Sequence, residues 1–175
     1  MPVKQGTFGT SPIYNGLYKI GKIFRGVDLV YQSVVYNPVI ALIERNIEKV
    51  DIELTSEITK IGSYAFNSCE SLKSIKIPNS VTSIGVYAFN GCTSLTKITI
   101  PNSVTSIGMA SFANCESLNE MTVLATTPPG LGASAISEAT TIIYIPSGTK
   151  SSYESATSWK DLLTRTTNPI TFVEV

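Results

Sequence analysis

The sequence predicts a β-rich solenoid, in which short and similar coils of chain stack on one another. Three observations predict it: a pattern that returns every 23 residues, an alternation of apolar and polar residues within it, and a proline after each alternating stretch. A fixed period in the twenties is typical of stacked repeats, and no single coil can bury its own apolar edge. The aligned positions are Ile61, Ile84 and Ile107; Phe66, Phe89 and Phe112; Cys69, Cys92 and Cys115; and Leu72, Leu95 and Leu118.

Each coil is predicted to begin with a half-buried strand. In residues 72–77, Ile75 and Ile77 point inward while Ser74 and Lys76 point outward, as period-two alternation requires. The segment Pro78-Asn79-Ser80 ends the strand, because proline cannot donate to the ladder and Asn and Ser favour turns. We therefore expect one main sheet built from equivalent strands.

The second half of each coil is predicted to return to the core. Val81 and Ile84 re-enter it, and Gly85 is expected to supply conformational freedom. The stretch Tyr87-Ala88-Phe89 is predicted to form a short helical turn or a second strand. Phe89 is the large side chain that fills the coil.

The repeat fades at both ends. Upstream, Ile52, Leu54 and Ile58 match Ile75, Ile77 and Val81 and form a partial coil. Downstream, residues 126–130 interrupt the fourth coil, Ala135-Ile136 replaces the Ala-Phe pair, and Ile143, Ile145 and Pro146 restore the strand and its proline. Residues 151–159 are predicted to form a short helix whose aromatic residues, including Trp159, cover the last coil.

The cysteines recur once per repeat, so equivalent thiols form a column about 4.8 Å apart in a stack. A metal ladder or a redox pair is one interpretation. However, the chain has three cysteines and no histidine. A closed tetrahedral site lacks a fourth ligand, and an odd number argues against a disulfide framework. We predict that these thiols are packing residues and that the protein holds no metal.

The repeat resembles a known family. Residues 61–85 read I-G-S-Y-A-F-N-S-C-E-S-L-K-S-I-K-I-P-N-S-V-T-S-I-G, which is similar to the BspA-type leucine-rich repeat. Residues 125–159 resemble the divergent last repeat of such proteins. The resemblance implies a leucine-rich-repeat solenoid over residues 51–160. It implies no catalytic residues, since family members include adhesion proteins of cell surfaces, protozoan surface proteins and phage-encoded proteins.

The first 50 residues differ from the repeats. Residues 1–18 are predicted to be an extended docking arm with Phe8, Tyr14 and Tyr18 as aromatic anchors, or else a loosely ordered tail. Residues 19–50 are predicted to hold a β-hairpin and an N-terminal cap. The hairpin turns at Gly26-Val27-Asp28, and its pattern resembles a small module of virion proteins from gut-bacterial phages.

Composition argues against several partners. The formal net charge is zero, and the first 50 residues carry six basic against three acidic residues. Such a mild bias is not expected to bind nucleic acid. No apolar run reaches the roughly 18 residues of a membrane span. The N-terminus has no apolar core of an export signal, so we expect that the protein stays where it is made or that a signal has been removed.

Enzymatic machinery is not expected. The absence of histidine excludes His-dependent triads, and no glycine-rich phosphate loop is present. The three aspartates, Asp28, Asp51 and Asp161, do not lie in a paired-carboxylate pattern. We therefore predict a protein that is not an enzyme and has no cofactor.

The solvent side of the main sheet is the predicted recognition surface. It is polar with mixed charge, as in repeat proteins that bind partners, although it could equally be only solvated. A separate column of Tyr64, Tyr87 and Ala110 is expected to be half-buried on another face. Next to Glu53, the recognition surface comprises Ser74, Lys76, Lys97, Thr99, Glu120, Thr122 and Tyr144.

Two functions follow. The first is a structural or attachment component of a phage virion that docks through its arm and belongs to a larger assembly. Its partners would be other virion proteins or its own copies. The alternative is a bacterial cell-surface or secreted adhesion module that contacts a host surface protein or glycan. In either case residues 161–175 are predicted to form a C-terminal strand, which could pair with the hairpin or with a neighbouring subunit.

Overall fold

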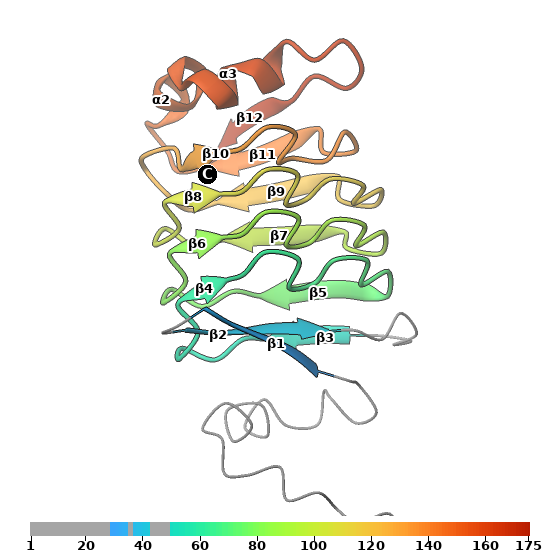
Figure 1. The fold of residues 1–175 in the computed structure, drawn as a ribbon. Coiled ribbons are helices and arrows are strands. Elements are labelled where there is room, and N and C mark those ends of the chain that lie inside the picture. Colours follow the sequence, from blue (N-terminus) through green and yellow to red (C-terminus); the bar gives the residue numbers. More distant parts are fainter. Residues whose placement is uncertain (1–28, 35–36, 43–49) are drawn as a thin grey trace, which may run out of the picture.

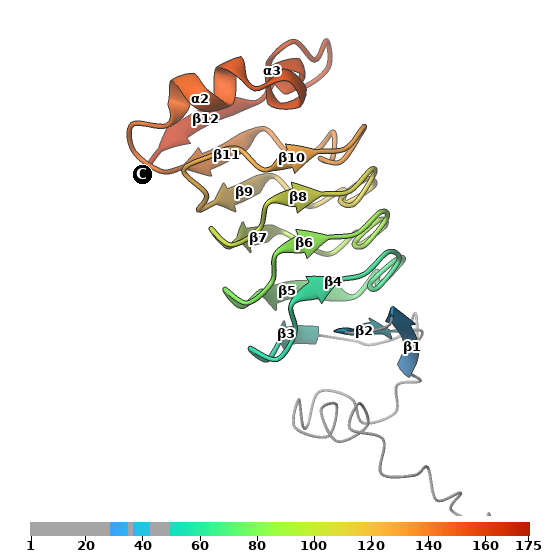
Figure 2. The same ribbon diagram turned by 60° about the vertical axis from the view of Figure 1, so that its left-hand side comes forward.

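The computed structural model describes residues 29–34, 37–42 and 50–175, and it confirms the predicted β-rich solenoid (Figure 1). Each coil contributes one longer and one shorter strand along the stack (Figure 2). The shorter strands form one parallel sheet, whereas the longer strands form two, one of two strands at the N-terminal end and one of four strands, and not the single main sheet that we expected. Equivalent strands are parallel because the chain returns to the same place in each coil. The longer strands are β3 (Val50–Glu53), β5 (Leu72–Lys76), β7 (Lys97–Ile100), β9 (Glu120–Val123) and β11 (Ile142–Ile145).

The short strands form the second sheet, in the order β10, β8, β6, β4. Each precedes the stretch that was predicted to be a helical turn or a strand, and that stretch is a turn. Backbone bonds between coils hold this turn, for example from Phe89 N to the Ser111 carbonyl at 2.7 Å. The short strands are β4 (Lys60–Ile61), β6 (Ser83–Ile84), β8 (Ser106–Ile107) and β10 (Gly130–Leu131).

The core is built from columns of identical side chains. Phe66 and Phe89 stack with ring centroids 5.0 Å apart, and Phe89 and Phe112 do so at 5.1 Å. Phe89 is completely buried, as predicted, and Ile136 occupies the buried place of the next phenylalanine. The partial first coil is also confirmed, since Ile52 pairs with Ile75.

The glycine that follows each short strand serves close packing. We expected Gly85 to provide conformational freedom, but a Cβ there would lie 2.4 Å from Ser63 N. Gly108 and Gly132 are equally crowded, with nearest backbone atoms at 2.6 and 2.4 Å. The backbones of successive coils touch at this corner, so a side chain has no room.

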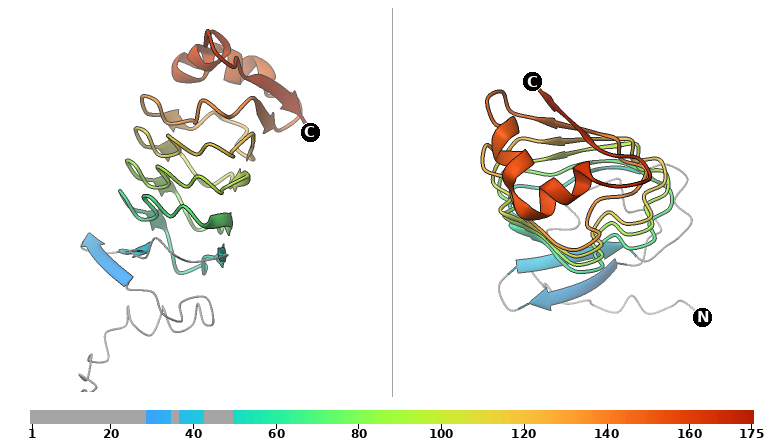
Figure 3. Two further views of the ribbon diagram at one scale, coloured as in Figure 1. Left: turned by 90° about the vertical axis from the view of Figure 1, so that its right-hand side faces the viewer. Right: turned by 90° about the horizontal axis from the view of Figure 1, so that it is seen from above.

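The C-terminal cap closes the stack (Figure 3). It comprises α2 (Lys150–Ser155), α3 (Thr157–Leu163) and β12 (Thr171–Glu174). Tyr153 and Trp159 are buried, which confirms the predicted cover of the last coil by aromatic residues. Their rings meet edge to face with centroids 5.0 Å apart, and both rings contact Phe172.

The C-terminal strand has a different partner from the two we predicted. β12 pairs in parallel with β11 of the same chain, with Ile143 opposite Phe172, and so extends the main sheet by one strand. The pairing satisfies the backbone edge that β11 would otherwise expose. Phe172, buried against Tyr153 and Trp159, fixes the register.

At the N-terminal end, β1 (Leu29–Val34) and β2 (Asn37–Leu42) form an antiparallel hairpin. The predicted hairpin turn at residues 26–28 and the docking arm of residues 1–18 lie outside the described residues. Among the residues that the structure describes, no helix is long and apolar enough to cross a membrane.

Candidate functional site

The outward face of the main sheet presents two aligned columns of side chains. By repeat position, the first column comprises Ser74, Lys97, Glu120 and Ile142, and the second comprises Glu53, Lys76, Thr99, Thr122 and Tyr144. Both columns are interrupted between β5 and β7, because these two strands belong to different sheets. Strand register places Lys97 opposite Glu120 and Thr99 opposite Thr122. Glu120 in turn lies opposite Ile142, and Thr122 opposite Tyr144. The predicted strip is therefore continuous across the strands β7, β9 and β11.

The N-terminal half of this face is charged and open to solvent. Lys76, Lys97 and Glu120 are exposed, whereas Ser74 is half-buried. Lys76 Nζ lies 2.6 Å from Glu53 Oε1, and the two side chains are 74% and 66% exposed, respectively. Such an exposed ion pair contributes at most about 1 kcal/mol to stability, so these charges are available to a partner.

Toward the C-terminal end the same face becomes apolar. Ile142, Tyr144 and Val173 are half-buried on neighbouring strands, with Tyr144 opposite Val173. Tyr144 was predicted from the sequence to lie on this face, whereas Ile142 and Val173 were not. Val173 could not be assigned to this face because the pairing of β12 with β11 was not predicted.

A second exposed feature lies on the loop side of the coils. Tyr64 and Tyr87 stack with centroids 5.2 Å apart, and Ala110 follows them in the column. We expected a half-buried column, but Tyr64 is 53% exposed, Tyr87 is half-buried and Ala110 is buried. All three have positive φ angles, between 50° and 61°. Ser134, at the same position of the next coil, also has a positive φ angle. The tight turn of each coil therefore imposes this backbone conformation on whatever residue occupies the position.

The cysteine column is a packing and hydrogen-bonding element. All three thiols are buried and none is in a disulfide, as predicted. Cys92 Sγ donates to the Phe66 carbonyl at 3.2 Å, and Cys115 Sγ to the Phe89 carbonyl at 3.1 Å. The sequence analysis did not anticipate these bonds between coils.

Thiol chemistry is unfavourable in this column. Burial raises the pKa of Cys69 to about 12. The Cys115 thiol beside it, and then burial, raise the pKa of Cys92 as well. The thiolate is the form that attacks substrates and binds metals, so neutral pH leaves both groups unreactive. Within the described part of the chain, no three His, Cys, Asp or Glu side chains could together hold a metal ion.

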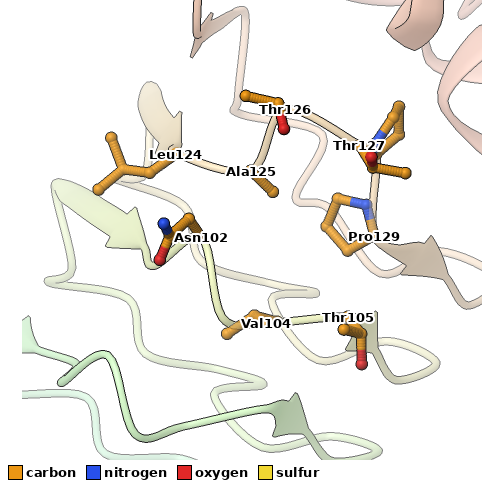
Figure 4. Close-up of a pocket in the computed structure, with 9 residues that line it drawn as sticks. Asn102, Val104, Thr105, Leu124, Ala125, Thr126, Thr127 and Pro129 are labelled. Atoms are coloured by element: carbon orange, nitrogen blue, oxygen red, sulfur yellow. The ribbon is translucent and has the colours of Figure 1, made fainter.

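A pocket lies where the repeat is interrupted. It has a volume of about 280 Å³ and is lined by the turns that follow β7 and β9 (Figure 4). The lining residues are Asn102, Val104, Thr105, Leu124, Ala125, Thr126, Thr127, Pro128 and Pro129. The proline pair in the sequence marked an interruption of the coil but gave no sign of a cavity.

The predicted docking residues Phe8, Tyr14 and Tyr18 lie outside the described residues. The candidate sites that the structure describes are therefore the strand face, the tyrosine column and the pocket. None of the three features contains a pair of groups arranged for nucleophilic or general acid–base catalysis.

The chain resembles known leucine-rich-repeat proteins. No curated protein matches its sequence. The crystal structure of a leucine rich cell surface protein from Faecalibacterium prausnitzii A2-165 is similar, with a TM-score of 0.59 and 26% sequence identity. The match covers 83% of this chain and 37% of that one, so the chain spans little more than a third of that protein's length.

A leucine rich repeat protein from T. pallidum shares the fold, with a TM-score of 0.52, 19% identity and coverage of 67% and 68%. The family model of the BspA type leucine rich repeat region matches residues 43–160 in six copies. This match includes all of the regular coils, α2 and the first part of α3. The chain belongs to the BspA-type leucine-rich-repeat family.

Proposed function

We propose that this chain is a non-enzymatic protein-interaction module that acts in adhesion at a bacterial cell surface or outside the cell. The observation that carries the proposal is the exposed strand face, on which aligned polar and charged side chains stand on a fixed sheet. Leucine-rich-repeat solenoids are typically not enzymes. The similarity to a cell surface protein supports the location.

The order of charges on the strand face favours a protein partner whose surface carries charges of both signs. Lys76 and Lys97 lie on adjacent coils, and Glu53 and Glu120 lie beyond them on either side. Charges in such an order complement a protein surface that carries both signs, and they favour specificity and fast association over raw affinity. The half-buried Ile142, Tyr144 and Val173 add an apolar contact at one end. Aromatic side chains such as Tyr144 are often the dominant contacts of an interface.

The virion hypothesis has less support. It rests on the N-terminal arm, which lies outside the described residues, and on a hairpin motif that the structure describes only from Leu29 onward. The similar solved structure is a cell surface protein, which favours the adhesion alternative. Mass spectrometry of purified phage particles tests the virion hypothesis directly, because a virion component would be found there in stoichiometric amount.

A matched pair of charge variants tests the strand face. The test variant is Lys76→Glu with Lys97→Glu. The control is Lys60→Glu with Lys160→Glu, which changes the net charge equally at exposed positions on β4 and α3. Binding to purified extracellular host proteins is measured by biolayer interferometry at low and physiological salt. We expect the test variant to lose binding and the control to retain it.

The salt series adds a second criterion. Binding through exposed charges weakens as ionic strength rises, because the screening length falls from about 30 Å at 0.01 M to about 8 Å at 0.15 M. Equal loss in both double variants would show that net charge and not the strand face controls binding. Retention in both would place the binding surface elsewhere.

A further inference from the structure

The pocket beside β7 and β9 arises from one extra residue. Val123 pairs with Ile100, 23 positions earlier, whereas Gly130 pairs with Ser106, 24 positions earlier. The turn after β9 is therefore one residue longer than the turn below it. The two turns cannot nest as the preceding turns do, and a cavity of about 280 Å³ opens between them.

The preceding turns are held together by a serine. Ser80 Oγ donates to the Ile58 carbonyl, and Ser103 Oγ donates to the Val81 carbonyl, both at 2.7 Å. The matching position in the longer turn is Thr126, whose hydroxyl has no hydrogen-bond partner among the described residues. The side chains of Asn102 and Thr127 likewise have none there. Three polar groups at this pocket can thus bind a ligand.

The chemistry of the lining is neutral. None of the nine lining residues is ionisable. Amide and hydroxyl groups come from the exposed Asn102, Thr126 and Thr127, while Leu124, which is 44% exposed, supplies accessible apolar surface. A charged ligand would find no partner of opposite sign here. A ligand with several hydroxyl groups and an apolar C–H face would satisfy both kinds of surface.

The cap fixes the upper wall of the pocket. Tyr153 Oη donates to the Ala125 carbonyl and Trp159 Nε1 donates to the Pro129 carbonyl, each at 2.7 Å and each buried. Gly130 N then bonds to the Thr105 carbonyl at 2.9 Å, which joins the upper turn to the lower one. A wall held in this way requires little ordering when a ligand binds, and preorganisation favours affinity.

We propose that this pocket binds a neutral sugar ring, as a free monosaccharide or as the terminal residue of a glycan. The volume lies just below the roughly 300–1,000 Å³ of pockets for drug-sized ligands, so a single ring fits its scale. Hydroxyl groups of the ring hydrogen-bond to Asn102, Thr126 and Thr127, and its C–H face lies on Leu124. This site is separate from the strand face and does not depend on the function proposed for it.

Nuclear magnetic resonance of the full chain tests the proposal. The amide signals of residues 102–105 and 124–129 are followed during titration with glucose, galactose and N-acetylglucosamine. Glucosamine and N-acetylneuraminic acid are the charged counterparts. We expect saturable shifts at millimolar concentration with a neutral sugar and none with the charged ones. Methyl glycosides and short oligosaccharides distinguish the two forms of the ligand. A site for the terminal residue of a glycan accepts a substituent at the anomeric carbon of the sugar, whereas a site for a free monosaccharide does not.

A matched pair of variants assigns the binding to the pocket. Asn102→Ala should weaken the best sugar about threefold to tenfold, the effect of one lost neutral hydrogen bond. Asn79→Ala is the control, because Asn79 is exposed at the same place one coil earlier and does not line the pocket. Thr127→Trp should fill the cavity and abolish binding, while thermal unfolding shows that the fold persists.

Three outcomes would overturn the proposal. The first is the absence of saturable shifts with every neutral sugar, and the second is equal weakening by Asn102→Ala and Asn79→Ala. The third is stronger binding of a charged sugar or of a short peptide, which would show that the pocket selects another class of ligand.

Discussion

The regular coils and the C-terminal cap are held together in different ways. In the coils, each core side chain packs on its own copy, as Phe66, Phe89 and Phe112 do at 5.0 and 5.1 Å. In the cap, Tyr153, Trp159 and Phe172 come from three different elements and make an aromatic cluster that has no counterpart in the repeat. The coils therefore share one repeated packing arrangement, whereas the cap has a packing arrangement of its own.

The difference extends to hydrogen bonds. Between coils the same bond can recur, as from the Cys92 and Cys115 thiols to phenylalanine carbonyls. Between the cap and the last coil each bond is made once, from Tyr153 to Ala125 and from Trp159 to Pro129. Loss of one cap bond should therefore act locally, whereas damage to a column should act on the whole stack.

The largest effect is expected from Phe89→Ala in the middle of the phenylalanine column. Phe89 is fully buried, so its truncation removes contacts with both stacked neighbours and leaves a cavity. We expect a loss of about 3–5 kcal/mol in the free energy of unfolding, measured by urea denaturation. The control Tyr64→Ala removes an exposed ring and should cost less than about 1.5 kcal/mol. A comparable loss for both variants would contradict the column as the centre of stability.

The next largest effect is expected at the glycine corner. In Gly108→Ala the new Cβ would lie 2.6 Å from the Gly85 backbone, so the coils must separate. We expect a loss of about 1–3 kcal/mol or more, as for other overpacked sites. Gly130→Ala is the control, since its Cβ would meet only the Thr105 carbonyl oxygen at 3.7 Å. Thermal unfolding of the two variants should differ clearly, and an equal effect would mean that the coils do not touch at Gly108.

A smaller effect is expected from Tyr153→Phe in the cap. The change keeps the ring against Trp159 and Phe172 but leaves the buried Ala125 carbonyl without its donor. We expect a loss of about 1–2 kcal/mol. Hydrogen exchange should become faster in residues 124–163 and remain unchanged in residues 61–100. Tyr144→Phe makes the same chemical change on the strand face and should be neutral. Faster exchange throughout the stack would show that cap and coils open as one unit.

The smallest effect at neutral pH is expected from thiol ionisation. Burial raises the pKa of Cys69 from its ordinary value of 9.0 to about 12 in the folded protein. The unfolded chain therefore loses protons first, so stability is intact below pH 9 and falls as the pH rises toward 12. The free energy of unfolding of Cys69→Ala, measured across this range, should fall less steeply than that of the parent. Equal slopes would contradict burial of the neutral thiol.

Much of the fold could be predicted because its information is local and repeated. Ile75 and Ile77 alternate with Ser74 and Lys76, and the period places each beside its equivalents. The partial first coil and the aromatic cover of the last coil followed from the same register. The docking arm predicted for residues 1–18 and the hairpin turn predicted at residues 26–28 stay predictions, as does the recognition role of the strand face.

The errors have physical causes. Gly85 was assigned conformational freedom because the sequence shows the residue but not the Ser63 backbone 2.4 Å from its missing side chain. The partner of residues 171–174 was missed because β-forming residues indicate a strand but not the edge on which it pairs. The pocket was missed because one additional residue in a turn changes the register by an amount visible only when the two turns are stacked.

By itself, the sequence determined the solenoid, its period, the buried columns and the outward polar positions, because a repeat encodes the same local geometry in every coil. The tertiary structure alone decided two features: the pairing of β12 with the edge of β11, and the cavity between unequal turns. The pairing of β12 with β11 and the Tyr153 and Trp159 bonds join residues that lie 28 to 30 positions apart, outside the 23-residue period. Contacts of that kind depend on how the coils are stacked, and no local pattern specifies them.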